Sequence, residues 1–309
     1  MSIVVVSIFN IELRSNSFSL EPGDFNSYKN LYSILGYLPI FNPNEPWTYR
    51  LTDTVDGCGT LMQHNQQLDL NKNWSFRFKL RFGSGKTTRT GDPGNGMALI
   101  LATNPSNPEV RYTPHNNELP VPMFRIEYDT EFGHTATEGG GDSIRRQHTA
   151  FLKNDSYVAL PNTFAEMQNN FAEVTNNQWI ECRIDFQHLS NGKILLENYI
   201  AEQSTGEMIL RNRMCFDAVT DLVADVVETD GKALVYWIFG AACCDLTVHN
   251  PNRHEIQYIS LENSDDIDFT SYSGVPNLTL IYRKWCGTLL TPPPTPSTLS
   301  YGDFDTTKE

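Results

Sequence analysis

The stretch that decides the fold class is WSFRFKLRF, residues 74–82. Trp, Phe, Phe, Leu and Phe occupy alternate positions in it, and Ser, Arg, Lys and Arg stand between them. Successive side chains of a β-strand point to opposite faces, so this period of two predicts a strand with one buried face and one solvated face. Such strands are typical of antiparallel sheets.

Short apolar segments of the same kind recur along the chain, separated by clusters of Gly, Pro, Asn and Asp that favour turns. They are MALIL (97–101), MFRIEYDT (123–130), WIECRIDF (179–186), KILLENYIA (193–201), ALVYWIFGAA (233–242), HEIQYISLE (254–262) and LTLIYRKW (278–285). Many short strands with polar turns predict an all-β protein, an antiparallel jelly-roll sandwich. Only residues 163–174 and 216–227 have a pattern compatible with a short helix.

Composition narrows the class of partner. The chain has 309 residues and a formal net charge of −14, from 23 Lys and Arg against 37 Asp and Glu. An acidic balance argues against nucleic acid or anionic lipid as a partner. No apolar run approaches the ~20 residues that span a bilayer. The start, MSIVVVSIFN, has no basic residues before its apolar stretch, so no signal peptide is evident. We expect synthesis in the cytoplasm, which is compatible with later display on a virion or a secreted particle.

The domain organisation follows from the same pattern. We expect an N-terminal strand or arm at residues 1–16, the sandwich at 17–262, a strand-rich extension at 263–290 and a flexible tail at 291–309. The tail is rich in Pro, Thr and Ser and cannot bury a core. None of the six cysteines has zinc-ligand spacing, and without a signal peptide we expect them to be mostly reduced.

The candidate site lies in FRIEYDTEFGHTATEGGGDSIRRQH, residues 124–148. In a strand, Glu127, Asp129 and Glu131 would share one face, where their charges repel one another. A bound cation or a shared catalytic proton would offset this repulsion, and a solvated acidic face is the simplest alternative. His148 and the GGGD loop with Asp142 favour a metal, because hard cations take oxygen ligands and imidazole suits a transition metal.

At this point the sequence resembles the L-type (legume-type) lectins over residues 50–262. Residues 94–101, GNGMALIL, resemble the family's DGLAFFL strand, and residues 126–130, IEYDT, resemble its VEFDT metal strand. Asp142 followed by His148 is similar to its GDP…HIGI loop. Residues 235–242, VYWIFGAA, and 254–260, HEIQYIS, are similar to its final strands. The order of these segments is the specific part of the resemblance.

The resemblance implies a concanavalin A-like jelly roll with a metal pair beside a shallow sugar site. The implied metal ligands are Glu127, Asp129, Asp142 and His148. The implied carbohydrate-binding residues are Asn95, Gly96 and Gly133. Asn95 replaces an Asp of the family motif and Gly133 replaces an Asn, so the charge that strengthens hydrogen bonds to sugar is missing at position 95. Calcium is the first cofactor expected, and manganese or another transition metal is the second.

Three functions are compatible with this sequence. The first is a non-enzymatic module that binds a surface glycan. The second is a structural or adhesion subunit of a virion, phage tail or contractile injection particle, assembled with further copies through its terminal arms. The third is a glycoside hydrolase, because residues 127–131 also resemble the ExDxE motif of family 16 enzymes. That resemblance would make Glu127 the nucleophile, Glu131 the acid/base and Asp129 the residue that tunes them. Retaining hydrolysis needs carboxyls about 5–5.5 Å apart.

Overall fold

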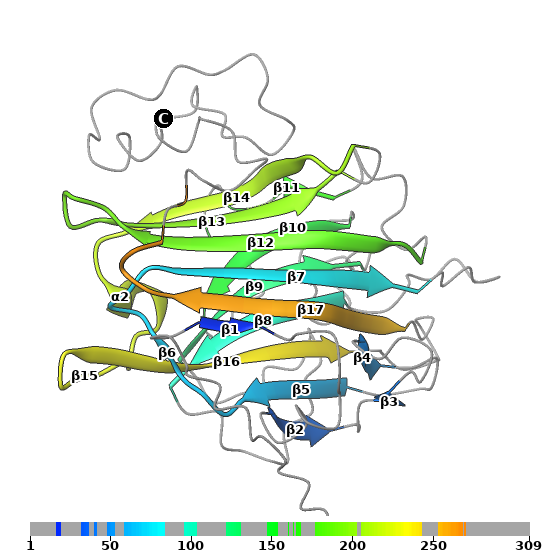
Figure 1. The fold of residues 1–309 in the computed structure, drawn as a ribbon, viewed down its shortest axis with the longest axis horizontal. Helices are drawn as coiled ribbons and strands as arrows, with labels where there is room; N and C mark the ends of the chain where they lie inside the picture. The colour runs from blue at the N-terminus through cyan, green and yellow to red at the C-terminus, as the bar shows by residue number, and fades with distance from the viewer. Residues whose placement is uncertain are drawn as a thin grey trace, which may run out of the picture.

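The protein is a sandwich of two antiparallel sheets (Figure 1). The structure, a computed structural model, describes residues 17–19, 32–36, 40–41, 48–52, 59–83, 96–103, 122–130, 147–153, 160, 163, 165–167, 177–202, 205–242, 253–267 and 269. The predicted fold class is confirmed by this architecture. The expected arm at residues 1–16, the extension at 263–290 except residues 263–267 and 269, and the tail at 291–309 lie outside the described residues.

The first sheet has eight strands in the described part of the chain. Its order is β14 (Met208–Phe216), β13 (Ile194–Ala201), β12 (Trp179–His188), β7 (Trp74–Phe82), β17 (His254–Asn263), β4 (Thr48–Thr52) and β3 (Ile40–Phe41). The short β1 (Ser17–Ser19) also pairs with β17. The neighbour of β17 changes along its length, since β4 pairs with residues 254–257 and β1 with residues 260–262. Tyr258, with φ +52°, lies at the irregularity between the two pairings.

The second sheet has nine strands in the described part of the chain. Its order is β11 (Ala165–Glu166), β10 (His148–Lys153), β9 (Met123–Asp129), β8 (Gly96–Ala102), β16 (Lys232–Ala242), β5 (Gly59–His64) and β2 (Tyr32–Gly36). β6 (Leu68–Asp69) and β15 (Glu228–Thr229) also pair with β16. A single short helix, α2 (Val219–Leu222), is described between the strands.

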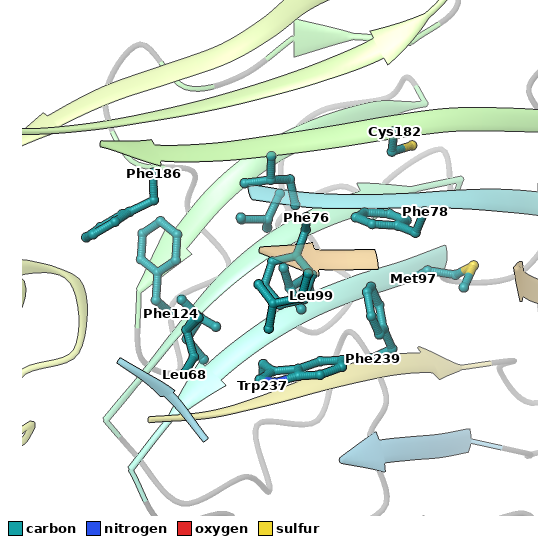
Figure 2. Packing of buried hydrophobic residues seen from close by; sticks show 14 of the residues in the cluster. Leu68, Phe76, Phe78, Met97, Leu99, Phe124, Cys182, Phe186, Trp237 and Phe239 are labelled. Carbon is teal, nitrogen blue, oxygen red and sulfur yellow. The ribbon is translucent and has the colours of Figure 1, made fainter. Parts of the chain in front are cut away.

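The core fills the space between the sheets, and large aromatic side chains dominate it (Figure 2). The apolar positions of residues 74–82 all point inward and are at most 1% exposed. Phe76 packs edge-on against Trp237 at 5.1 Å, and Phe78 packs in the same way against Phe239 at 5.0 Å. Aromatic pairs in this geometry stabilise a core beyond the area that they bury. The alternating pattern of the sequence therefore becomes the contact between the two layers.

Both sheets also bury side chains on their outer faces. Every residue of β8 is buried, and Ala98, Ile100 and Ala102 belong to a second apolar cluster on the outer face of the nine-stranded sheet. A strand that is buried on both faces reads as a continuous apolar run, as MALIL does. A third cluster lies on β13 and β14, around Tyr199 and Leu210.

Charged side chains are buried on the outer face of the eight-stranded sheet, where the sequence predicted a solvated face. The Asp185 carboxylate accepts hydrogen bonds from Arg183 and from Ser75, whose hydroxyl donates at 2.7 Å. Burial raises the pKa of Asp185, and the charges and hydrogen bonds of its partners oppose that shift. Glu255, 1% exposed, pairs with Arg50 at 3.0 Å and Arg81 at 2.6 Å. The expectation of a solvated face is therefore wrong for Asp185 on β12 and Glu255 on β17, which are buried with arginine partners. On β7 the polar positions 77, 79 and 81 remain partly exposed.

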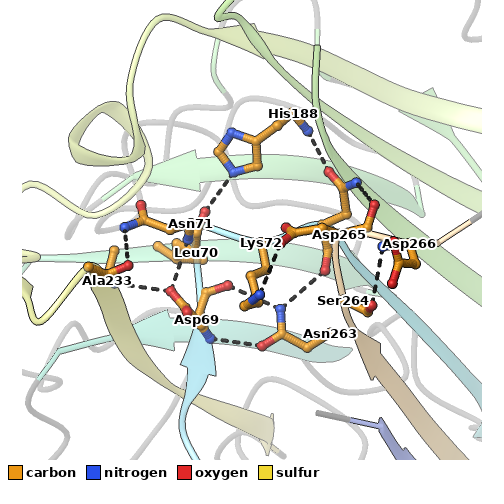
Figure 3. A network of polar contacts seen from close by, with 12 residues as sticks. Asp69, Leu70, Asn71, Lys72, His188, Ala233, Asn263, Ser264, Asp265 and Asp266 are labelled. Atoms are coloured by element: carbon orange, nitrogen blue, oxygen red, sulfur yellow. Dashed lines mark hydrogen bonds and ion pairs between the residues drawn. The ribbon is translucent and has the colours of Figure 1, made fainter. Parts of the chain in front are cut away.

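A polar seam joins the two sheets at one end of the sandwich (Figure 3). Asn263 on β17 accepts a hydrogen bond from the backbone of Asp69 on β6 and donates to the carbonyls of Asp69 and Asn73. The Asp69 carboxylate accepts from the backbone N–H groups of Asn71 and Ala233 at 3.1 and 3.0 Å. Side chains thus satisfy backbone groups where strands of both sheets begin and end.

Three smaller expectations change. Residues 163–174 have a pattern compatible with a short helix, but β11 occupies part of this range, paired with β10. In residues 216–227 the helix is limited to α2, whose start is capped by the Asp221 carboxylate.

Cys182 is buried and free, whereas Cys215 is disulfide-bonded, so the expectation of reduced cysteines is wrong for Cys215. Among the described residues, no helix has the length and apolar character to cross a membrane.

Candidate functional site

The candidate site lies where β9 ends and β10 begins. Phe124, Ile126 and Tyr128 of β9 point into the core, so Glu127 and Asp129 share the outer face. The antiparallel register places His148, the first residue of β10, directly opposite Asp129. The 18 residues from 130 to 147 connect the two strands, and strand pairing brings their ends together. Local alternation and register therefore assemble the group without any special backbone geometry.

Glu127, Asp129 and His148 each present a ligand atom, and these atoms all lie within 4.8 Å of one another. The distance from His148 Nε2 to Glu127 Oε1 is 3.5 Å. Asp129 and His148 are 5% and 1% exposed, and the side chain of Glu127 is 13% exposed. This is the only group of three His, Cys, Asp or Glu side chains with such spacing in the part of the chain that is described.

The chemistry of this group suits a divalent cation. Two largely buried carboxylates on one strand face repel each other, and a cation bound between them would remove that cost. Two carboxylates and one imidazole form a mixed oxygen and nitrogen donor set, which manganese, zinc and related metals accept. Calcium prefers oxygen alone and would draw further ligands from other groups. The residues present therefore fit a metal, and a transition metal fits this donor set better than calcium.

The backbone of β8 approaches the site closely. Gly96, the first residue of β8, has φ +96°, a conformation that favours glycine. A Cβ at this position would lie 2.1 Å from the Tyr128 carbonyl oxygen and 3.0 Å from the Asp129 Cα. Glycine at position 96 thus allows β8 to pack against the peptide that carries Asp129.

On the inner face, Tyr128 and Thr149 occupy the positions beside the three candidate ligands. The Tyr128 hydroxyl donates a hydrogen bond of 2.7 Å to Asn198 Oδ1 on β13. Burial raises the pKa of Tyr128 well above its usual value, and the Cys182 thiol beside it contributes to the shift. The hydroxyl therefore stays protonated and remains a donor at any physiological pH.

The structure brings together some of the site residues that were predicted from the sequence, and the others lie outside the described residues. Glu127, Asp129 and His148 form one cluster, and Gly96 lies beside it. Asn95, Glu131, Gly133 and Asp142 lie outside the described residues. Sequence reasoning missed the inward-facing polar partners of the site. The signal for them was a tyrosine at a core position of β9, where a phenylalanine would bury no polar atom.

No protein-family model matches this chain, and no curated protein is similar to it in sequence. Solved structures do match. A lectin from Bauhinia forficata in complex with GalNAc has a TM-score of 0.58 at 16% identity, over 81% of this chain and 99% of the lectin. The basic winged bean lectin with Tn-antigen has a TM-score of 0.55 at 14% identity, over 81% and 99%. The Ca²⁺-bound exoplasmic/lumenal domain of VIP36 has a TM-score of 0.52 at 16% identity, over 85% and 96%.

These matches establish the fold, a legume-lectin-like sandwich, as the order of sequence segments predicted. They cover about four fifths of the chain and nearly the whole of each lectin. At such low identity they carry the fold alone.

Proposed function

We propose that this protein is a carbohydrate-binding module with a lectin-type sandwich, and that a metal held by Glu127, Asp129 and His148 supports its sugar site. The observation that carries the proposal is the cluster itself. Two carboxylates and an imidazole converge on the outer face of a sheet, in a fold whose solved neighbours include lectins in complex with sugars. Asp142, six residues before His148 in the sequence, is proposed as a further ligand.

The metal would act by holding the chain rather than by touching the sugar. A cation supplies charge that neutralises Glu127 and Asp129 and so fixes the end of β9 against the start of β10. The chain that leaves β9 and enters β10 contains Gly133 and Asp142, and Asn95 precedes β8. Amide and carboxylate groups from these segments would meet the sugar hydroxyls in a shallow site.

A glycan array tests the proposal. The protein is applied in buffer with Ca²⁺ and Mn²⁺, again in EDTA, and again after each metal is added back alone. The proposal predicts binding to a defined set of glycans, loss of that binding in EDTA, and recovery with at least one metal. Binding that survives EDTA would overturn the role of the metal. Absence of binding to every glycan in the presence of both metals would overturn carbohydrate recognition.

A further inference from the structure

A network of buried polar side chains crosses the interior of the sandwich directly behind the metal cluster. Tyr128 on β9 donates to Asn198 on β13 at 2.7 Å. Asn198 Nδ2 donates to Asn212 Oδ1 on β14 at 2.7 Å and to Thr149 Oγ1 on β10 at 3.1 Å. Thr149 Oγ1 in turn donates to Asn212 Oδ1 at 3.1 Å. Two strands of each sheet are thereby connected through side chains alone.

The network is closed. Asn212 Nδ2 donates to the backbone carbonyls of Thr149 and Thr163, and Asn198 Nδ2 has two acceptors. All N–H groups of both amides are therefore used. The side chains of Tyr128, Thr149, Asn198 and Asn212 are at most 1% exposed. Water does not compete for these bonds, and removal of one member would leave a buried partner without its hydrogen bond.

The network reaches the nine-stranded sheet at two residues, and these two adjoin all three candidate ligands in the sequence. Tyr128 stands between Glu127 and Asp129 on β9, and Thr149 follows His148 on β10. Tyr128 and Thr149 are also direct cross-strand partners. Because neighbouring residues of a strand point to opposite faces, the side chains inside fix the same backbone that carries the ligands outside.

The anchor of the network on the eight-stranded sheet is a point of irregular pairing. Asn198 and Asn212 face each other across β13 and β14, and the register shifts immediately after them, so that Tyr199 pairs with Leu210. One extra residue, Arg211, is thus accommodated in β14. Bulges of this kind redirect side chains and are found beside functional sites.

We propose that Tyr128, Thr149, Asn198 and Asn212 form a positioning network that sets the spacing of the three metal ligands from the far side of the sheet. Strand pairing sets the register of β9 and β10. Apolar packing alone would tolerate small shifts of this pair against β13 and β14, whereas directional hydrogen bonds fix its position. The proposal rests on the metal site of the preceding section. It assigns to these four residues an effect on metal affinity that goes beyond their contribution to folding.

The polar seam at the other end of the sandwich provides a matched control (Figure 3). Asn263 is 3% exposed and, like Asn198, uses its side chain to bind across the two sheets. Along β16, Leu234 is paired with Asp69 of the seam, and Ala241 is paired with Met97, the partner of Tyr128. Seven residues of strand separate the two rows, about 23 Å. Loss of Asn263 should therefore reduce stability without moving the metal ligands.

The test measures Mn²⁺ affinity by isothermal titration calorimetry on metal-stripped protein, together with the thermal unfolding midpoint. Tyr128→Phe removes one hydroxyl and keeps the ring packed against Phe78. Asn198→Leu removes the central amide, and Asn263→Leu is the same substitution in the control seam. We expect Tyr128→Phe to weaken Mn²⁺ binding about tenfold, as loss of a supporting hydrogen bond around a metal site does, and Asn198→Leu to weaken it further. Asn263→Leu should lower the midpoint and leave the affinity within about twofold of wild type.

The outcomes separate this inference from the proposed function. Tyr128→Phe and Asn198→Leu proteins that bind Mn²⁺ as wild type does, whatever their midpoints, would overturn the positioning role and leave the metal site intact. A wild-type protein that binds neither Mn²⁺ nor Ca²⁺ would overturn the metal site and the inference together. If Asn198→Leu fails to fold, Tyr128→Phe decides the question, because it leaves the volume of the core almost unchanged.

Discussion

Gly96 lies against the backbone of Tyr128 so closely that a Cβ at position 96 would be 2.1 Å from the Tyr128 carbonyl oxygen. The same added Cβ would lie 3.0 Å from the Asp129 Cα. The start of β8, which carries the predicted sugar-binding residue Gly96, and the end of β9, which carries Asp129, are therefore in direct backbone contact. Any side chain at position 96 would have to separate them.

We predict that Gly96→Ala abolishes or severely weakens metal binding and destabilises the fold by several kcal/mol. A positive φ costs alanine about 1 kcal/mol, and displacement of the Tyr128–Asp129 peptide adds to that cost. Gly192→Ala is the matched control, because Gly192 also has a positive φ, +82°, but nothing within 4 Å of its added Cβ. Calorimetric titration with Mn²⁺ and urea unfolding should show metal loss for Gly96→Ala only. Equal effects of the two variants on metal binding would refute the contact argument.

Stability should fall on the acid side because of two buried histidines. Burial lowers the pKa of His254 to about 3 and that of His64 to about 4. In the unfolded chain these two histidines take up protons below about pH 6.5, whereas in the folded chain they stay neutral until near pH 4 for His64 and near pH 3 for His254. The unfolded state thus binds more protons in this window, so the free energy of unfolding decreases as the pH falls. Each histidine contributes up to about 1.4 kcal/mol per pH unit.

Urea unfolding of wild type and His64→Phe between pH 7 and pH 4 measures this effect. Phenylalanine keeps the stacking on Trp237, which lies 4.4 Å from the His64 ring, and removes the titration. We expect a shallower dependence on pH for His64→Phe. An identical slope for the two proteins would show that His64 is protonated equally in the folded and unfolded states.

The Asp69 carboxylate of the polar seam should contribute measurably to folding. Asp69→Ala leaves the N–H groups of Asn71 and Ala233 without their acceptor, at a cost of about 2–3 kcal/mol. Asp69→Asn keeps an acceptor oxygen at the same place and should lose less than half as much. Chemical denaturation of the two variants tests the difference. Equal losses would mean that the charge of Asp69, rather than its two hydrogen bonds, carries the effect.

We predict no hydrolysis of β-glucans by this protein. The hydrolase alternative assigned Glu127 as nucleophile, but the Glu127 carboxylate lies 3.5 Å from His148 within a three-residue donor group that suits a metal. Reducing-sugar release from β-glucans, compared between wild type and Glu127→Gln, is the measurement. Activity in wild type that disappears in Glu127→Gln would reinstate the enzyme and contradict the binding role.

The parts of the fold that could be predicted from sequence are those fixed by local periodicity. Alternation across residues 74–82 predicted β7 and its inward face, and the same alternation placed Glu127 and Asp129 on one side of β9. His148 joins them because β10 runs antiparallel to β9, so that the first residue of β10 lies opposite the last residue of β9. The order of the sequence segments made this arrangement recognisable.

The remaining features depend on partners that are distant in sequence. Asn198 meets Tyr128 and Thr149 across separations of 70 and 49 residues, and no local pattern marks that meeting. Buried charges such as Asp185 and Glu255 were also beyond sequence reasoning. A strand in which charged and apolar residues alternate has the same sequence pattern whether its charged face is solvated or covered.

The most direct test of the central claim compares glycan binding by wild type, His148→Ala and His188→Gln in buffer with Mn²⁺ and Ca²⁺. His188 lies at the opposite end of the sandwich, where its ring contacts the Leu70 carbonyl, and serves as the control. A site that depends on metal held by Glu127, Asp129 and His148 predicts glycan signals near wild type for His188→Gln and their loss for His148→Ala. Full glycan binding by a folded His148→Ala protein would contradict the account.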